Sequence, residues 1–231
     1  NAGLHRAPIR ARRWPAPQGT PHPNLKAFKM DQDPQRAPTD QELELLSQEM
    51  PALARLRDFA RLAESVQWFS DLGTPLRKSV REIARAYLDG LGFPDVHMAR
   101  LHSWEEAAAA GESLDWDTEG WEAEEGLRAA LTTDALEQLS QEALEVGLAY
   151  LFSAIEDPIR QAVLTAAAIW GEDDEELLAA AMGSALQAAH CAALAVVAGE
   201  DDETHPFIHR FRLFERGRWP VSLAGRTYNI F

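Results

Sequence analysis

The sequence predicts a mainly α-helical fold, a bundle of about seven or eight helices with a small C-terminal antiparallel β-hairpin or meander. Three observations lead to this prediction. Apolar residues recur at spacings of three or four over most of residues 39–198, and capping residues and glycines divide that stretch into segments of helical length. After residue 206 the spacing changes to two, with glycines at the turns, which is typical of short strands.

The first predicted helices carry start signals. Thr39 and Glu42 form a capping box, in which each side chain accepts a hydrogen bond from the other residue's backbone N–H. Pro51 suits the first turn of a second helix, because an N–H in that position would have no partner. We expect Gly73 to end this helix and Pro75 to open a third. The second helix has one apolar face, formed by Leu53, Leu56, Phe59, Leu62, Val66 and Phe69.

The middle of the chain alternates short and long helical segments. Ser103 and Glu106 form a second capping box, and residues 95–101 before it fit either a short strand or a loop. We expect Thr133 to cap a long helix with a leucine-rich core stripe, and Pro158 to begin the next helix.

Two glycines mark the ends of the last predicted helices. Gly171 and Gly199 each follow an alanine-rich stretch and precede the same Glu-Asp-Asp-Glu run. We interpret each glycine as a helix stop followed by acids that favour the next N-terminus, and the alternative is a duplicated helix pair. The last two predicted helices, residues 158–170 and 175–198, carry alanine where leucine would otherwise stand. This predicts a pair of helices that pack closely, in the centre of the bundle or at a subunit interface.

The C-terminal segment predicts β-structure. Residues 207–214 alternate with the period of a strand, and a turn is expected at residues 216–218. Further strands are expected at residues 221–223 and 228–231, which gives two or three antiparallel strands in all.

These patterns divide the chain into three parts. Residues 1–38 form an irregular, basic, proline-rich arm, residues 39–203 a helical domain, and residues 204–231 a C-terminal β-hairpin packed on the helical domain.

Charge is distributed very unevenly along the chain, whose net charge is −15. Residues 101–203 contain 24 Asp and Glu against two Arg, a net charge of −22, whereas residues 204–231 carry +4. The first 29 residues contain six Lys and Arg and no acid. An acidic face of this kind repels nucleic acid and anionic membranes and attracts a basic partner. The basic ends could instead dock on the acidic middle of the same chain or of a second copy.

Two features of the sequence concern the cellular compartment. No apolar run is expected to reach the roughly 18 residues that span a bilayer, so we expect no membrane association. Cys191 is the single cysteine, which excludes intrachain disulfides and favours a cytoplasmic location.

Acid pairs are the first candidates for chemistry, because facing carboxylates can hold Mg²⁺ or Mn²⁺ for phosphate hydrolysis on an all-α scaffold. Glu142 with Glu145, and Glu156 with Asp157, loosely suggest half of such an arrangement, and the second half is missing. We therefore expect no metal ligand, and keep an all-α metal-dependent phosphohydrolase as an alternative function.

Histidine, cysteine and glycine patterns also give no catalytic or cofactor-binding residue. His190 and Cys191 are adjacent in a helix, so their side chains diverge and cannot act together as base and nucleophile. The other histidines lack the spacing of a zinc site, and no glycine-rich phosphate loop is present. The sequence therefore leans away from an enzyme and predicts no cofactor.

The predicted partner site is a pair of tryptophans within an acidic stretch. Asp115, Trp116, Asp117 and Trp121 lie in a segment, residues 105–125, with nine acids and no Lys or Arg. An aromatic centre with a charged rim is typical of a protein-binding hot spot. We therefore predict a non-enzymatic, acidic interaction protein that binds a basic partner, as a toxin-neutralising immunity protein or a nucleic-acid mimic does. A structural homodimer that associates through the N-terminal arm is the other alternative.

Overall fold

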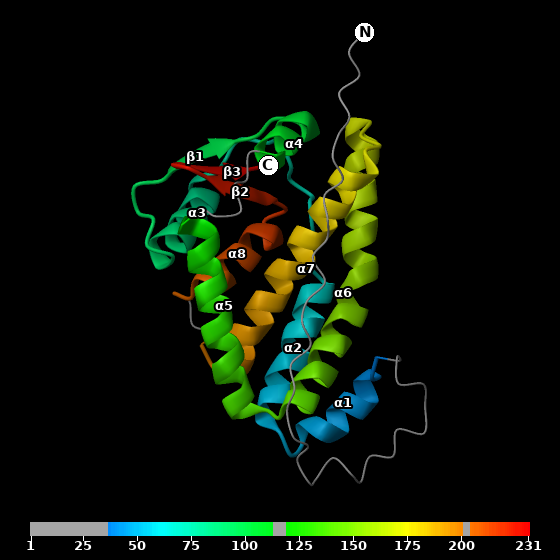
Figure 1. Ribbon diagram of the computed structural model, residues 1–231. Coiled ribbons are helices and arrows are strands. Elements are labelled where there is room, and N and C mark those ends of the chain that lie inside the picture. The colour runs from blue at the N-terminus through cyan, green and yellow to red at the C-terminus, as the bar shows by residue number, and fades with distance from the viewer. Residues whose placement is uncertain (1–36, 113–118, 201–203) are drawn as a thin grey trace, which may run out of the picture.

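The structure, a computed structural model, describes residues 37–112, 119–200 and 204–231. Within these ranges the chain forms eight helices and one three-stranded sheet, which confirms the mainly α-helical prediction (Figure 1). The predicted basic arm lies almost entirely outside the described residues.

The sheet lies at one end of the molecule, near α3, α4 and α8, and the long helices form the bundle beside it (Figure 1). In chain order the helices are α1 (Asp40–Ser47), α2 (Pro51–Glu64), α3 (Lys78–Gly90), α4 (Trp104–Glu112), α5 (Glu119–Gln138), α6 (Gln141–Trp170), α7 (Glu175–Ala198) and α8 (Pro206–Glu215). The strands are β1 (His97–Arg100), β2 (Pro220–Ala224) and β3 (Thr227–Ile230).

The sheet is mixed, with the order β1-β3-β2. The hairpin of β2 and β3 is antiparallel, as predicted, whereas β1 pairs with β3 in parallel. The segment that fitted either a strand or a loop is therefore a strand. Its partner comes from the C-terminal end of the chain, which period-two spacing alone does not reveal.

Several predicted helix ends are confirmed. The capping box is present: the Glu42 N–H donates to Thr39 Oγ1 (3.3 Å) and the Thr39 N–H donates to Glu42 Oε2 (2.7 Å). Gly171 and Gly199 adopt left-handed φ values of 71° and 81° and end α6 and α7. Asp174 then caps α7 by accepting from two backbone N–H groups. These contacts match the interpretation of the two glycines as helix stops.

Two predicted boundaries in the long helices are wrong. Thr133 lies inside α5, where its hydroxyl donates to the Ala129 carbonyl (3.1 Å), and the cap of the long helix is Ser140, whose hydroxyl accepts from the Ala143 N–H (3.2 Å). Pro158 lies within α6 instead of beginning a helix. The proline removes one hydrogen bond, but α6 buries apolar residues on both sides of it, which favours a continuous helix.

The segment between α2 and α3 is also longer than predicted. Helix α2 ends at Glu64, well before Gly73, and α3 begins at Lys78 instead of Pro75. The intervening turns bury Trp68 and Phe69 against Phe214, with ring centroids 5.4 and 5.6 Å apart. The apolar side chains whose spacing predicted a longer helix here pack against α8 instead.

The strand predicted at residues 207–214 is a helix, α8. His205 Nδ1 caps it by accepting from the Phe207 N–H (3.2 Å), and Pro206 occupies the first turn. Nearly every residue of α8 is buried, including Arg210. A helix that is buried on nearly all sides has no clear polar face, so its sequence shows no clear helical period. Arg210 and Arg212 stand at alternate positions, and this spacing predicted a strand.

Helix α7 lies at the centre of the bundle and contacts α2, α5, α6 and α8 (Figure 1). Its central positions are buried and small, so neighbouring backbones can approach closely. The alanines with no exposed surface are Ala181, Ala185, Ala188, Ala189, Ala192, Ala193 and Ala195. This position confirms the prediction for residues 175–198. The prediction is wrong for residues 158–170, which form the end of α6, where Leu164 and Ile169 are exposed.

Helix α6 approaches α2 closely at Gly147. A Cβ atom at this position would lie 2.5 Å from Leu56 Cδ2 and 3.0 Å from Leu53 Cδ2. Both leucines have no exposed surface, so neither side chain has room to rotate away. Glycine is therefore required here by packing, against its low helix propensity.

We predict that Gly147→Ala destabilises the protein by about 1–3 kcal/mol, because overpacking outweighs the gain in helix propensity. The matched control is Gly126→Ala in α5, where a Cβ would meet no atom within 4 Å, and which should stabilise by about 0.5–1 kcal/mol. Urea unfolding followed by circular dichroism measures both. Equal effects of the two substitutions would show that the α2–α6 contact is looser than the structure has it.

Arg218 joins the C-terminal hairpin to the segment between α2 and α3 through hydrogen bonds. Its side chain is 0% exposed. It donates to Asp71 Oδ2 (2.9 Å) and to the Thr74 carbonyl (2.9 Å), and it also contacts the Thr74 hydroxyl. The preceding residue, Gly217, has a φ of 70° and accepts from the Asp71 N–H (3.0 Å). One buried guanidinium thus organises two segments that are far apart in the sequence.

Arg218→Ala should lower the free energy of unfolding by about 3 kcal/mol, because it leaves the Asp71 carboxylate and the part-buried Thr74 carbonyl without their donor. Arg216→Ala, which removes an exposed arginine two residues away, should change stability by no more than about 0.5 kcal/mol. Chemical denaturation of both variants tests the difference, and similar midpoints would contradict this role of Arg218.

Candidate functional site

Only one residue of the predicted partner site can be located. Asp115, Trp116 and Asp117 lie outside the described residues. Trp121 lies in the first turns of α5 and is 47% exposed. The partner site at these residues therefore stays a prediction.

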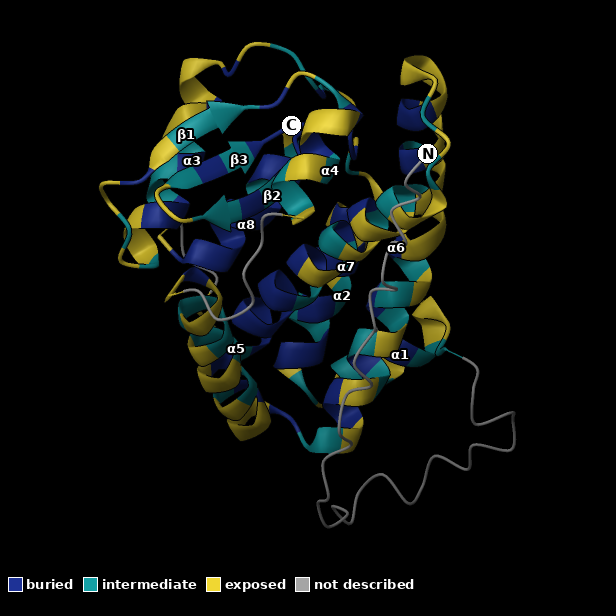
Figure 2. Cartoon of the chain, turned by 45° about the horizontal axis from the view of Figure 1, so that its top comes forward, coloured by how far each residue is buried: buried dark blue, intermediate teal, exposed yellow. Residues whose placement is uncertain are grey.

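A second exposed apolar region lies where α6 joins α7, which we call the hairpin end (residues 169–178). Ile169 is 77% exposed, and Trp170 is 44% exposed although its ring packs against Phe231 with centroids 5.6 Å apart. Figure 2 shows much of this end of the two helices as exposed. Large apolar side chains on a surface mark a candidate interaction site when they lie together.

Acids surround these apolar side chains. Five acids in a row, residues 172–176, follow the α6 end, and residues 161–200 contain no Lys or Arg. Glu172 and Asp174 are used locally, since both accept hydrogen bonds from backbone N–H groups. Glu175 and Glu176 are exposed in the first turn of α7. The hairpin end therefore combines an exposed apolar centre with an acidic rim.

The acid pairs considered for metal binding do not face each other. Glu142, Glu145, Glu156 and Asp157 are exposed along the single helix α6, and Asp157 pairs with Arg160. Within the described ranges, no group of three or more His, Cys, Asp and Glu side chains is placed to hold a metal ion.

His190 and Cys191 occupy different surroundings in the core. The His190 ring stacks on Phe152, with centroids 5.9 Å apart and planes 6° apart. Burial, and to a lesser extent the nearby Arg128 guanidinium, lowers the pKa of His190 to about 4. Burial raises the pKa of the Cys191 thiol to about 12, so the thiol stays protonated. Both residues are uncharged near neutral pH and serve packing.

A buried polar network joins α3, α5 and α8. Glu124 accepts from Arg210 Nη1 (2.8 Å) and from the Tyr87 hydroxyl. Burial is the largest single influence on the pKa of Arg210 and lowers it, but the Glu124 carboxylate, together with Tyr228 and Cys191, raises the pKa above its usual value. The Tyr228 ring lies 5.3 Å from that of Tyr87, and burial raises the pKa of its hydroxyl. The pairing of Arg210 with Glu124 gives the network a structural role.

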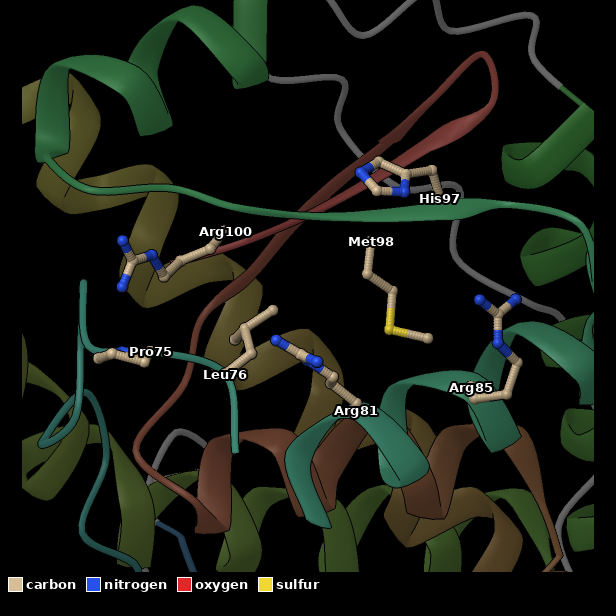
Figure 3. Close-up of a pocket in the computed structure, with 7 residues that line it drawn as sticks. All are labelled: Pro75, Leu76, Arg81, Arg85, His97, Met98 and Arg100. Atoms are coloured by element: carbon tan, nitrogen blue, oxygen red, sulfur yellow. The ribbon is translucent and has the colours of Figure 1, made fainter. Parts of the chain in front are cut away.

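A basic groove lies between α3 and β1 (Figure 3). Its volume is about 460 Å³, and no carboxylate lines it. In Figure 3 Arg100 and Arg85 lie toward opposite ends of the groove, with Arg81 between them. The remaining lining residues are Pro75, Leu76, His97 and Met98.

One pattern in the sequence indicates this groove, although the net charge of each segment does not show it. Arg77, Arg81 and Arg85 recur every four residues, which places them along one face of α3. Arg100 comes from a strand, so only the tertiary structure brings it to the same groove.

No protein-family model matches this chain, and neither a curated protein nor a solved structure matches it. Its function is therefore inferred from the residues and contacts described above.

One helix among the described residues, α7 (Glu175–Ala198), is long and apolar enough to cross a membrane by length and composition, contrary to the expectation from the sequence. In the fold, 61% of its apolar window is buried. This burial is compatible with the core helix of a soluble protein.

We predict that His190 makes the stability of the protein depend on pH. Its pKa is about 4 in the folded state and near 6.5 when unfolded, so only the unfolded chain takes up a proton between these values. Stability contributed by this residue is therefore lost as the pH falls, by about 2 kcal/mol between pH 7 and pH 5. Urea midpoints should fall less over this interval in His190→Gln than in the wild type. Parallel pH profiles would contradict the assignment.

Proposed function

We propose that this chain is a non-enzymatic, cytoplasmic interaction protein whose acidic surface binds a basic protein partner through the hairpin end. The observation that carries the proposal is Ile169, which is 77% exposed beside a half-exposed tryptophan and a row of five acids.

The energetics of such a complex divide between the apolar centre and the acidic rim. Burying the exposed parts of Ile169 and Trp170 supplies a favourable term of about 25 cal/mol per Å² of apolar surface. The carboxylates attract a basic partner from a distance and raise its association rate, an effect that salt screens over about 8–10 Å. We therefore expect a partner with an apolar pocket bordered by Lys and Arg.

The test uses quantitative capture from a lysate of the source organism with three tagged proteins: the wild type, Ile169→Asp and Leu45→Asp. Leu45 is a matched control, because it is 57% exposed on α1, at the other end of the bundle (Figure 1). Trp170 is not substituted, since its ring also packs against Phe231.

One basic protein retained by the wild type and by Leu45→Asp, and reduced about tenfold or more by Ile169→Asp, is the expected result. The purified pair should then form a complex whose association slows between about 0.1 and 0.5 M salt. Equal recovery by all three proteins would contradict the proposed site. Recovery of the chain alone, with a dimer mass by light scattering, would favour the homodimer alternative.

A further inference from the structure

We infer that the groove between α3 and β1 binds an extended acidic peptide segment, which adds as a strand to the free edge of β1. This groove is basic, whereas the hairpin end is acidic, so its ligand differs from the basic partner of the proposed function.

Strand β1 is an edge strand, because the sheet order is β1-β3-β2. The backbone N–H groups of His97 and Leu101 donate to β3, to the carbonyls of Arg226 (2.9 Å) and Ile230 (2.8 Å). Backbone groups in a strand alternate in direction, so those of Met98 and Arg100 point toward the free edge. An unpaired edge of this kind is a template for another strand.

The carbonyl of Val96, the residue before β1, already has a partner at this edge, and this contact marks one end of the groove. Arg85 donates to the Val96 carbonyl (3.0 Å) and to the Pro94 carbonyl (2.6 Å). These bonds hold the Arg85 guanidinium beside the start of β1 and leave the edge groups of Met98 and Arg100 to an incoming strand. Helix α3 forms the opposite wall.

The charges around this edge are positive and have few internal partners. Arg100 Nε donates to His102 Nε2 (3.1 Å), whose other ring nitrogen lies 3.1 Å from Glu106 Oε2, so a carboxylate lies behind Arg100. No hydrogen bond joins the two terminal nitrogens of Arg100 to another described residue. Arg81 is exposed, and no hydrogen bond or ion pair joins its side chain to another described residue. The closest acid on α3, Glu82, pairs with Lys78 instead (3.6 Å). Guanidinium groups bind carboxylates in a planar, two-bond geometry.

The arrangement of these groups selects an extended ligand over a compact anion. The three arginines are spread along the groove instead of converging on one point, and Leu76 and Met98 lie between the outer two (Figure 3). A strand that presents acids on both sides of an apolar side chain matches this order, and its main chain can bond the β1 edge. The net charge of −15 does not prevent this, because repulsion beyond about 8–10 Å is screened at physiological salt.

The test measures binding of a blocked synthetic peptide, Thr-Glu-Thr-Leu-Thr-Glu-Thr, to the full chain by isothermal titration calorimetry. In a strand, the two Glu and the central Leu of this peptide lie on one face. Arg81→Gln and Arg100→Gln should each weaken binding about fivefold or more, which corresponds to the loss of one charge-assisted contact. Arg160→Gln makes the same change of charge on α6, outside the groove, and should leave the affinity unchanged. Amide exchange at Met98 and Arg100 should slow when the peptide binds.

Three control ligands distinguish strand addition from simple charge attraction and from the binding of a small anion. A peptide with Lys in place of every Glu should not bind, and a peptide N-methylated at alternate residues should lose about tenfold or more in affinity, because it cannot pair with a strand edge. Equal binding of the N-methylated peptide would overturn strand addition. Inorganic phosphate that displaces the peptide at a similar concentration would show a small-anion site instead. An unchanged affinity of both groove variants would overturn the site itself.

Discussion

The packing of α7 by small side chains is the constraint on which the rest of the fold depends. Its buried alanines let α2, α5, α6 and α8 approach one central helix, and a larger side chain at any of these positions would push a neighbour away. Gly147 does the same for α6 against α2. Once these helices are close, the C-terminal segment can enclose its aromatic residues, and Phe231 reaches both Trp104 and Trp170. The sheet packs against these helices.

Charge in this protein is divided between the interior and two different surfaces. The basic tail looked available for a partner, but Arg210 is buried on Glu124 and Arg218 on Asp71, so two of its five arginines are satisfied within the chain. Exposed acids lie at the hairpin end, where residues 161–200 contain no Lys or Arg, whereas the arginines of α3 and β1 border a groove without a carboxylate. A single net charge of −15 therefore conceals one surface suited to a basic partner and another suited to an acidic ligand.

The sequence was informative about local signals and less so about candidate sites. The capping box at Thr39 and the glycines at 171 and 199 depend on contacts within a few residues, and the structure has them as predicted. Residues 207–214 were misread because a fully buried helix has no polar face to set its period. The basic groove was missed because Arg100 joins the arginines of α3 only through the pairing of β1 with β3.

The sequence by itself determined the class of the fold, several helix ends and the C-terminal hairpin, since all of these follow from spacing and from interactions between near neighbours. Tertiary structure decided that α6 continues through Pro158, that β1 joins the sheet in parallel, and which charges are buried. These outcomes depend on contacts between residues far apart in the chain, such as Arg218 with Asp71. The free energy of such contacts arises only when the core assembles, so no local pattern reports them.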